Sequence, residues 1–457
     1  MNKYILCLLV AILTGCSTEI AATFMCPPCD QSCDITKFNH DGPCPTCGME
    51  LTQMGTYDEK LSRQQIEEDL QILHQTLLSN HPGLYDYQTK DDFSTIFKSL
   101  MTQAASAKSV MDEYLLASQL IAAVSDAHTY VMHPYYQKVL QEELLFPLIP
   151  KIDGNQIFIE GRRVRSVNGH SEARILSRLQ LFANSDGSTI PYKNAFVEME
   201  FPLKYFTFLD KASAFEIVFE NEEMKTMQGK SYFMKGLRPK VVAPTFQILG
   251  DSALLKIPDW EDETAGSFNQ NLTEMEQVSD LGKFIGQSMK ALIAAKSKRL
   301  IIDLRGNKGG KSGPAAILLS YLIDQPFKYY SEIQVLSDTF PTKEFISNKA
   351  LVEFYESDDA RQLIEEVGGA YFFKEALLPL ILPKADQFTG EVELLVDKYT
   401  LSVSTDLVAI LQKNREIVIK GVEIGGSLAH YCAGNYINLV LPNSGIHVNI
   451  PLQRLKY

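Results

Sequence analysis

The chain has 457 residues, of which 45% are hydrophobic and 22% are charged, so it is long enough for two or three domains with buried cores. This composition excludes a disordered chain, and 27 glycines without a tripeptide period exclude a collagen-like one. The formal net charge of −13 argues against a nucleic-acid binder.

The first residues predict an exported protein. A short basic start precedes an apolar run from Tyr4 to Leu13 that is too short to span a bilayer. The run closes on Leu13-Thr-Gly-Cys16, which resembles the lipobox of bacterial lipoproteins. That resemblance implies a signal peptide over residues 1–15 and a lipid anchor on Cys16; an ordinary secretory signal is the alternative. Ser17 then favours the outer membrane of a bacterial envelope, facing the periplasm or the surface.

A small cysteine module is expected next, because seven of the 8 cysteines lie in the first 47 residues. The pairs Cys26-Pro-Pro-Cys29 and Cys44-Pro-Thr-Cys47 can close a tetrahedron around Zn²⁺ or another heavy metal. Residues 16–57 therefore predict a lipid-anchor linker and a zinc-ribbon-like module, which resembles the heavy-metal-binding modules of envelope proteins. Two disulfides are the alternative, and Cys33 and His40 are spare candidate ligands.

The remaining chain predicts helices first, then strands, then an alternation of both. From Leu61 to about Ala123, apolar residues recur at three- and four-residue steps, with a break at His81-Pro-Gly83. From about Phe146 to Val242 the pattern is typical of short strands, and from Phe246 onward it favours an α/β core. The expected strands include 156–159, 213–219, 299–304 and 391–396, and the expected helices include 314–322 and 406–412.

A glycine-rich loop follows the expected strand 299–304. Gly306-Asn-Lys-Gly-Gly310 has only three residues between its outer glycines, whereas a phosphate-binding P-loop has four, so we expect no nucleotide. The stretch Asp303-Leu-Arg-Gly-Asn-Lys-Gly309-Gly310 instead resembles the DLRxNxGG segment of the S41 serine peptidases, which include the tail-specific (C-terminal processing) proteases and the tricorn core peptidase. In that family these glycines bring a backbone N–H to the oxyanion of the tetrahedral intermediate.

Three further segments resemble motifs of this family, in the family's order. Val124-Ser-Asp-Ala-His128-Thr129 resembles the L-x-DGHT segment of the tricorn-like branch, which supplies a histidine base. Lys398-Tyr-Thr-Leu-Ser402-Val403-Ser-Thr-Asp406 resembles the T-x-S-A-x-E nucleophile segment, and Gly421-Val-Glu423-Ile-Gly-Gly426 loosely matches the GExxGG loop. The resemblance covers about residues 60–457.

This resemblance implies a fold and a domain order. The fold is a crotonase/ClpP-like α/β peptidase core over 246–457. An N-terminal helical region over 58–135 carries the candidate base, and a β-rich, degenerate PDZ-like insert spans 136–245. The implied activity is hydrolysis of polypeptides through an acyl-enzyme, with no cofactor for catalysis. The alternative is a catalytically inactive peptide-binding or metal-handling lipoprotein on the same scaffold.

The resemblance also implies the site residues. Ser402 is the candidate nucleophile and His128 its base, because a serine hydroxyl needs an adjacent base. Gly309, Gly310 and Val403 are the candidate oxyanion amides. Residues 425–428 contain no lysine, which disfavours the Ser–Lys dyad of the processing-protease branch. For the acid that orients the histidine, Asp126 and Glu423 both stay open.

Overall fold

The computed structural model describes residues 24–25, 33, 36–40, 42–46, 48, 51–53, 59–187, 189–232, 242–368 and 370–457. The chain divides into two compact units, 1–54 and 55–457. The predicted signal peptide and Cys16 lie outside the described residues. None of the described helices combines the length and the apolar character needed to cross a membrane.

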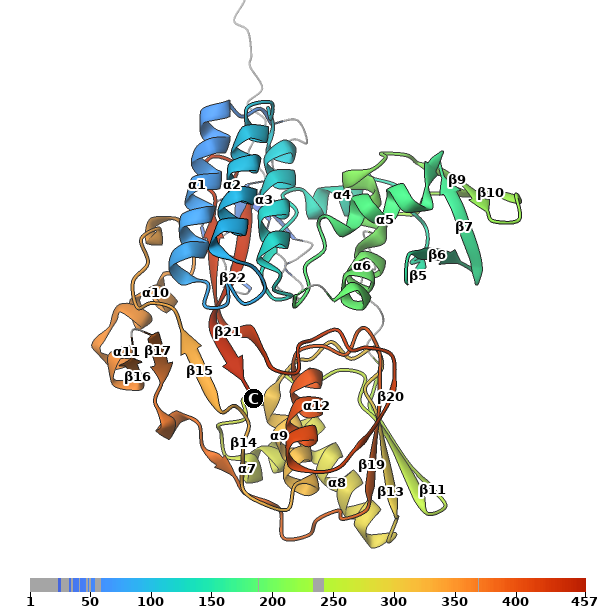
Figure 1. The fold of residues 1–457 in the computed structure, drawn as a ribbon, viewed down its shortest axis with the longest axis vertical. Helices are drawn as coiled ribbons and strands as arrows, with labels where there is room; N and C mark the ends of the chain where they lie inside the picture. The colour runs from blue at the N-terminus through green and yellow to red at the C-terminus, as the bar shows by residue number, and fades with distance from the viewer. Residues whose placement is uncertain are drawn as a thin grey trace, which may run out of the picture. The chain divides into compact units, whose positions relative to one another are not determined.

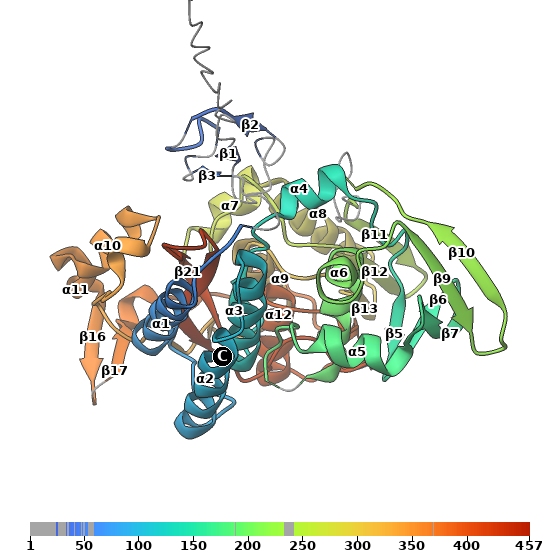
Figure 2. The same cartoon turned by 90° about the horizontal axis from the view of Figure 1, so that it is seen from above.

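The first unit contains a small antiparallel sheet, drawn in Figure 2, with the strand order β2-β1-β3. Its strands are β1 (Phe24–Met25), β2 (Lys37–Phe38) and β3 (Thr52–Gln53). Cys33 and Cys44 are buried and pack with Leu51. Three of the four predicted metal ligands, Cys26, Cys29 and Cys47, lie outside the described residues. The zinc-ribbon assignment therefore stays a prediction.

The second unit begins with three helices that stand side by side in Figure 1: α1 (Arg63–Asn80), α2 (Lys90–Ala104) and α3 (Val110–Val124). Ser62, Thr89 and Ser109 cap their N-termini by accepting backbone N–H groups. Because α1 ends at Asn80, the predicted break at residues 81–83 is confirmed. One apolar face of each helix is buried in a common core.

The next segment differs from the prediction of strands alone. It contains strands β5 (Lys151–Asp153), β6 (Gln156–Ile159), β7 (Arg162–Val167), β8 (His170–Ser171), β9 (Ala214–Phe219) and β10 (Met224–Gln228), together with helices α4 (Tyr136–Glu142), α5 (Glu172–Gln180) and α6 (Ile190–Phe208). The prediction missed α5 and α6. Most residues of α6 are buried, and they include many aromatic residues and an internal proline, Pro202. Such a sequence lacks the one-sided period of a surface helix.

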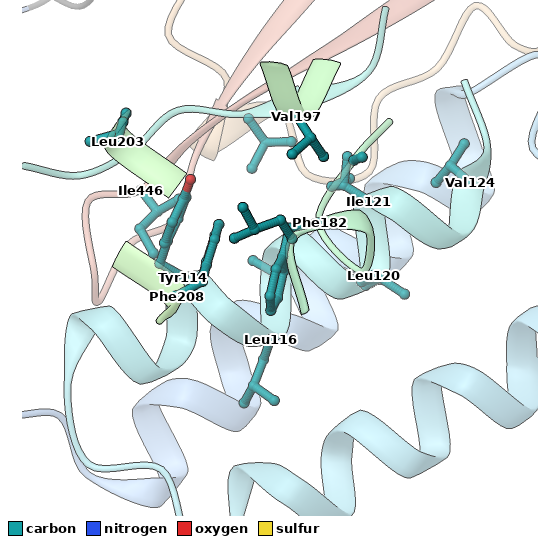
Figure 3. Close-up of a cluster of buried hydrophobic side chains, with 14 of the residues drawn as sticks. Tyr114, Leu116, Leu120, Ile121, Val124, Phe182, Val197, Leu203, Phe208 and Ile446 are labelled. Atoms are coloured by element: carbon teal, nitrogen blue, oxygen red, sulfur yellow. The ribbon is translucent and has the colours of Figure 1, made fainter. Parts of the chain in front are cut away.

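Helix α6 packs directly against α3. Figure 3 shows side chains of both helices in one buried cluster, together with Phe182 from the loop after α5. Tyr114 of α3 stacks on Phe208 of α6 with ring centroids 6.0 Å apart, and Phe208 stacks on Phe182 at 3.9 Å. The two helices therefore share one hydrophobic core.

The α/β core is confirmed. Its five-stranded sheet has the order β11 (Thr245–Leu249), β12 (Ser252–Lys256), β13 (Arg299–Asp303), β19 (Glu391–Val396) and β20 (Val418–Gly421), and every pair except β11–β12 is parallel. Apolar side chains of this sheet pack with those of α7 (Leu272–Val278), α8 (Asp280–Ala294), α9 (Ser312–Leu322) and α12 (Val403–Asn414). Figure 1 shows α9 and α12 next to each other.

A second sheet connects the core to the N-terminal helices. Its order is β16 (Ile364–Val367), β17 (Ala370–Phe373), β15 (Glu332–Val335), β22 (His447–Lys456) and β21 (His430–Val440), and β4 (Tyr130–Val131) also pairs with β22. Near it lie α10 (Lys349–Glu356), α11 (Asp358–Leu363) and the short pair β14 (Phe327–Lys328) with β18 (Leu380–Ile381). One end of the β21–β22 hairpin packs with α1–α3 and the other with the α/β core. Side-chain packing thus joins regions that the sequence analysis divides at residues 135/136 and 245/246.

Candidate active site

Ser402 lies at the carboxyl edge of the parallel sheet, between β19 and α12. Its backbone has φ 55° and ψ −126°, a conformation that costs a non-glycine residue roughly 1–3 kcal/mol. The preceding turn is tightly bonded: the Asp397 carboxylate accepts the N–H of Tyr399 at 2.9 Å and that of Gly306 at 3.0 Å, and the Asp397 N–H donates to the Thr400 hydroxyl at 3.0 Å. This network holds Ser402 in a strained, partly exposed position.

The glycine loop after β13 lies directly against this serine. A Cβ added at Gly309 would stand 2.7 Å from the Ser402 Cβ and 3.1 Å from its Oγ. At Gly310, an added Cβ would stand 2.5 Å from the Trp260 carbonyl carbon. Both glycines have positive φ, 107° and 139°. Only glycine fits at these two positions, and the structure brings the predicted oxyanion loop to the predicted nucleophile.

The amides around Ser402 differ in their availability. The Gly309 N–H donates to Asn307 Oδ1 at 2.9 Å, and Asn307 is itself fixed by donating to the Ile257 carbonyl at 2.8 Å. Val403 is the first residue of α12, so its N–H has no acceptor within the helix. Within the described part of the chain, the Gly310 N–H makes no hydrogen bond either. Val403 and Gly310 are therefore the amides free to bind an oxyanion, while Gly309 shapes the loop.

His128 follows α3 through a turn. The first residue of the turn, Ser125, adopts the left-handed conformation (φ 58°, ψ 41°), and the turn leads into β4, which pairs with β22. The imidazole is 14% exposed, and its ring centroid lies 5.1 Å from that of Tyr431. Burial lowers the pKa of His128 below its usual 6.5, although the negative charge of Asp126 opposes the shift. The ring is neutral at neutral pH, as a general base must be.

The loops that carry Ser402 and His128 meet beside α6. The residues that precede them, Leu401 and Ala127, pack in one hydrophobic cluster with Ala195 of α6. Among the described residues, no hydrogen bond joins the Ser402 hydroxyl to His128, whose Nδ1 is buried without a hydrogen-bond partner. In ligand-free structures such bonds are often long and shorten when substrate binds. Packing of Leu401 and Ala127 in one cluster thus brings the two loops together, and no hydrogen bond between the Ser402 and His128 side chains is formed in the described part of the chain.

Asp126 is the carboxylate nearest to the base. Its Oδ1 lies 4.0 Å from His128 Nδ1 and accepts the His128 backbone N–H at 3.3 Å. Its Oδ2 accepts a hydrogen bond from the Thr129 hydroxyl and contacts His81 Nε2 at 3.2 Å. Burial alone would raise the pKa of Asp126, but His81, His128 and Thr129 together hold it below its usual range. Asp126 is therefore an anchored, ionised group beside the imidazole.

A second buried carboxylate, Asp186, lies beside the base and was not predicted from the sequence. It accepts the Ala127 N–H at 2.9 Å and the Ser427 N–H at 3.4 Å, and so it joins the base loop to the loop after β20. Burial and the charge of Asp126 raise the pKa of Asp186 to about 7. One donor atom from each of Asp126, His128 and Asp186 lies within 4.8 Å of the others, so this trio could also hold a metal ion. The sequence around Asp186 is typical of an ordinary polar turn, and no local pattern distinguishes this aspartate.

Glu423, the other candidate acid, is exposed and makes no hydrogen bond or ion pair within the described part of the chain. The loop that carries it nevertheless packs on the nucleophile segment. The Gly425 N–H donates to the Thr400 carbonyl at 3.0 Å, and a Cβ at Gly426 would stand 2.3 Å from the Thr405 hydroxyl. The geometry therefore favours Asp126 over Glu423 as the partner of His128.

Asp406, one turn beyond Ser402, is fully buried among tyrosines. Its carboxylate accepts the Tyr330 and Tyr457 hydroxyls, each at 2.8 Å, and Tyr330 also bonds Tyr431 at 3.0 Å. Burial raises the pKa of Asp406 to about 6, and the tyrosine hydrogen bonds limit the rise. Because Tyr431 also contacts the His128 ring, this cluster links the base to the first turn of α12.

The chain is similar to known peptidases in sequence and in fold. Residues 251–430 match the model of peptidase family S41, and no curated protein matches the chain. Mature CPAF in complex with lactacystin has a TM-score of 0.56 at 12% identity, covering 85% of this chain and 90% of CPAF. Mature CPAF alone has 0.55 at 13%, covering 86% and 89%. The photosystem II D1 C-terminal processing protease has 0.40 at 11%, covering 87% and 89%. The likeness to CPAF shows a shared fold over most of both chains.

Proposed function

We propose that the protein cleaves polypeptides through an acyl-enzyme formed on Ser402, because residues 251–430 match the model of peptidase family S41. The observation that carries this proposal is the placement of Ser402. It has a strained backbone at the start of α12, with Gly309 against its side chain. A free helix N-terminus beside a nucleophile favours a developing negative charge.

The proposed reaction uses His128 as the proton carrier. It accepts the Ser402 proton as Oγ attacks the substrate carbonyl carbon. The Val403 and Gly310 N–H groups then bind the oxyanion of the tetrahedral intermediate. His128 returns the proton to the leaving amine, and a water molecule, activated by the same base, hydrolyses the ester. No cofactor takes part in these steps.

Asp126 is proposed as the acid that stabilises the imidazolium form of His128. At 4.0 Å the carboxylate and the ring are too far apart for a hydrogen bond, but close enough for a charge interaction. A small rotation of the His128 ring, as substrate binds, would bring Nδ1 within bonding distance. Asp126 itself cannot move freely, because Thr129 and His81 hold its second oxygen.

The test is hydrolysis of an unfolded, fluorophore-labelled polypeptide by the purified mature protein. Ser402→Ala and His128→Ala are each expected to lower kcat/KM by about 10³-fold or more, and the double variant no further, because the two residues act as a unit. Additive losses, or hydrolysis by Ser402→Ala at the wild-type rate, would exclude this mechanism. A wild type without activity would instead favour the inactive peptide-binding scaffold.

We also propose that the cysteine module binds Zn²⁺ or another heavy metal, and that a lipid on Cys16 anchors the protein to a bacterial envelope membrane, the outer membrane being favoured. Support for the metal comes from the two CxxC pairs and the burial of Cys44. Metal content is expected to fall in Cys44→Ser and to stay unchanged in Cys432→Ser, a buried cysteine of the second unit. Cys16→Ser is expected to release the protein from the membrane fraction. Equal metal content in both variants would refute the metal site.

A further inference from the structure

We propose that Glu198 is a positioning residue that fixes the turn carrying Ser402 from the side of helix α6. The inference rests on the proposed function of Ser402 and extends it to a helix outside the region that matches family S41. The observation behind it is the meeting of one buried carboxylate with two residues of the turn, Lys398 and Tyr399.

Glu198 is fully buried, and both of its oxygens are occupied. Oε1 accepts the Lys398 ammonium group at 2.6 Å and the Ile152 N–H, and Oε2 accepts the Tyr399 hydroxyl. Lys398 also donates to the Ile152 carbonyl at 2.6 Å. Glu198, Lys398, Tyr399 and the Ile152 backbone thus form one partly buried cluster that spans α6, β5 and the nucleophile turn. Charge-assisted bonds of this kind are the strong ones in proteins.

Two other residues on the same face of α6 also reach the site. Tyr192, Ala195 and Glu198 follow one another at three-residue steps, which places them along one side of the helix. Ala195 packs with Leu401, and a Cβ at Gly425 would stand 2.5 Å from the Tyr192 ring. In Figure 3, Val197 and Phe208 of α6 belong to the cluster that contains α3. Helix α6 therefore supports both the nucleophile turn and the helix that leads to His128.

This support matters because Ser402 is strained. A non-glycine residue keeps φ 55° and ψ −126° only when its surroundings over-determine that conformation. Asp397 and Thr400 restrain the turn through bonds within it, and Glu198 restrains it from α6. Without Glu198, Lys398 and Tyr399 lose their hydrogen bonds to α6, and Ser402 can relax away from the oxyanion amides. Misplacement by about 1 Å costs up to about 100-fold in rate.

The experiment compares Glu198→Leu with Glu276→Leu. Glu276 is a matched control, because it too is a buried carboxylate that accepts a tyrosine hydroxyl, Tyr321 at 2.8 Å, and pairs with lysines, Lys290 at 3.3 Å and Lys384 at 2.5 Å. Two properties are measured: the second-order rate constant of labelling by a fluorophosphonate, and hydrogen–deuterium exchange of the segment 397–402. We expect Glu198→Leu to label about 10-fold or more slowly and to exchange faster in that segment, while Glu276→Leu changes neither. Glu198→Gln keeps an acceptor for Lys398 and is expected to recover most of the rate.

The outcomes separate this inference from the proposed function. If the wild type labels and Glu198→Leu labels equally fast, the positioning role is wrong while the serine peptidase stands. If the wild type fails to label, the proposed function fails, and the exchange of residues 397–402 still decides whether Glu198 restrains the turn. If both leucine variants slow labelling equally, the effect is general destabilisation and the inference is overturned. Should Glu198→Leu not fold, Tyr399→Phe removes one of the bonds and is judged by the same two measurements.

Discussion

The close contact between Gly309 and Ser402 predicts the outcome of one small substitution, Gly309→Ala. The new methyl carbon would stand 2.7 Å from the Ser402 Cβ, 3.1 Å from its Oγ and 3.2 Å from the Leu401 carbonyl oxygen. The first distance is far shorter than the 3.5–4.0 Å at which carbon atoms attract. Either the glycine loop or the serine must move by roughly 1 Å to relieve the overlap.

Two costs follow, and they can be separated. Alanine at φ 107° lowers the free energy of unfolding by roughly 1–2 kcal/mol through backbone strain alone. The displacement of Ser402 from the oxyanion amides adds a loss of kcat of about 10²-fold or more, the scale of a lost oxyanion donor. Gly306→Ala is the matched control. Gly306 lies in the same loop with φ 84°, but a Cβ there has no atom within 4 Å, so only the strain applies.

The assay is kcat and KM on the labelled polypeptide, with urea unfolding of each variant. We expect both variants to lose stability, Gly309→Ala at least as much as Gly306→Ala, and only Gly309→Ala to lose kcat, with KM nearly unchanged. Wild-type kcat in Gly309→Ala would refute the placement of this loop at the nucleophile. An equal loss of kcat in Gly306→Ala would show that loop strain, rather than contact with Ser402, is responsible.

Three further predictions test the surroundings of the serine. Asp126→Asn removes a negative charge that raises the pKa of His128. The acidic limb of the pH profile of kcat/KM should therefore move to lower pH, and kcat should fall by about 100-fold. An unchanged pH profile would contradict the role of Asp126. Burial raises the pKa of Asp406 from 3.8 to about 6, so the folded state binds this proton more tightly than the unfolded state does. The free energy of unfolding should therefore fall by roughly 3 kcal/mol as pH rises from about 4 to 6. Urea unfolding should show a smaller fall over this range in Asp406→Asn. Ser402→Gly relieves the backbone strain at φ 55°, so its free energy of unfolding should exceed that of Ser402→Ala by roughly 1 kcal/mol. Equal urea midpoints for the two variants would mean that the turn is not strained.

Local pattern was sufficient to predict much of the fold. The strand at 391–396 and the helix after it have clear periods, and the break at His81-Pro-Gly83 ends α1 as expected. The motifs placed the glycine loop and Ser402 each directly after a strand, and parallel strands bring such ends to one edge of a sheet. These predictions depend on interactions close in sequence or on a simple topological rule.

The parts that the sequence did not predict depend on distant partners. Helix α6 has apolar residues on nearly every side, because it packs against α3 on one face and the nucleophile turn on another, so its pattern has no clear helical period. Asp186 and Glu198 are single acidic residues whose burial comes from segments 46 to 241 positions away. No local signal distinguishes them from surface acids.

Mass spectrometry of the protein after reaction with a fluorophosphonate decides whether Ser402 is an activated nucleophile. We expect a single adduct, mapped by peptide digestion to Ser402, lost in Ser402→Ala and formed far more slowly in His128→Ala. An adduct on another serine, or none on the natively folded wild type, would contradict it.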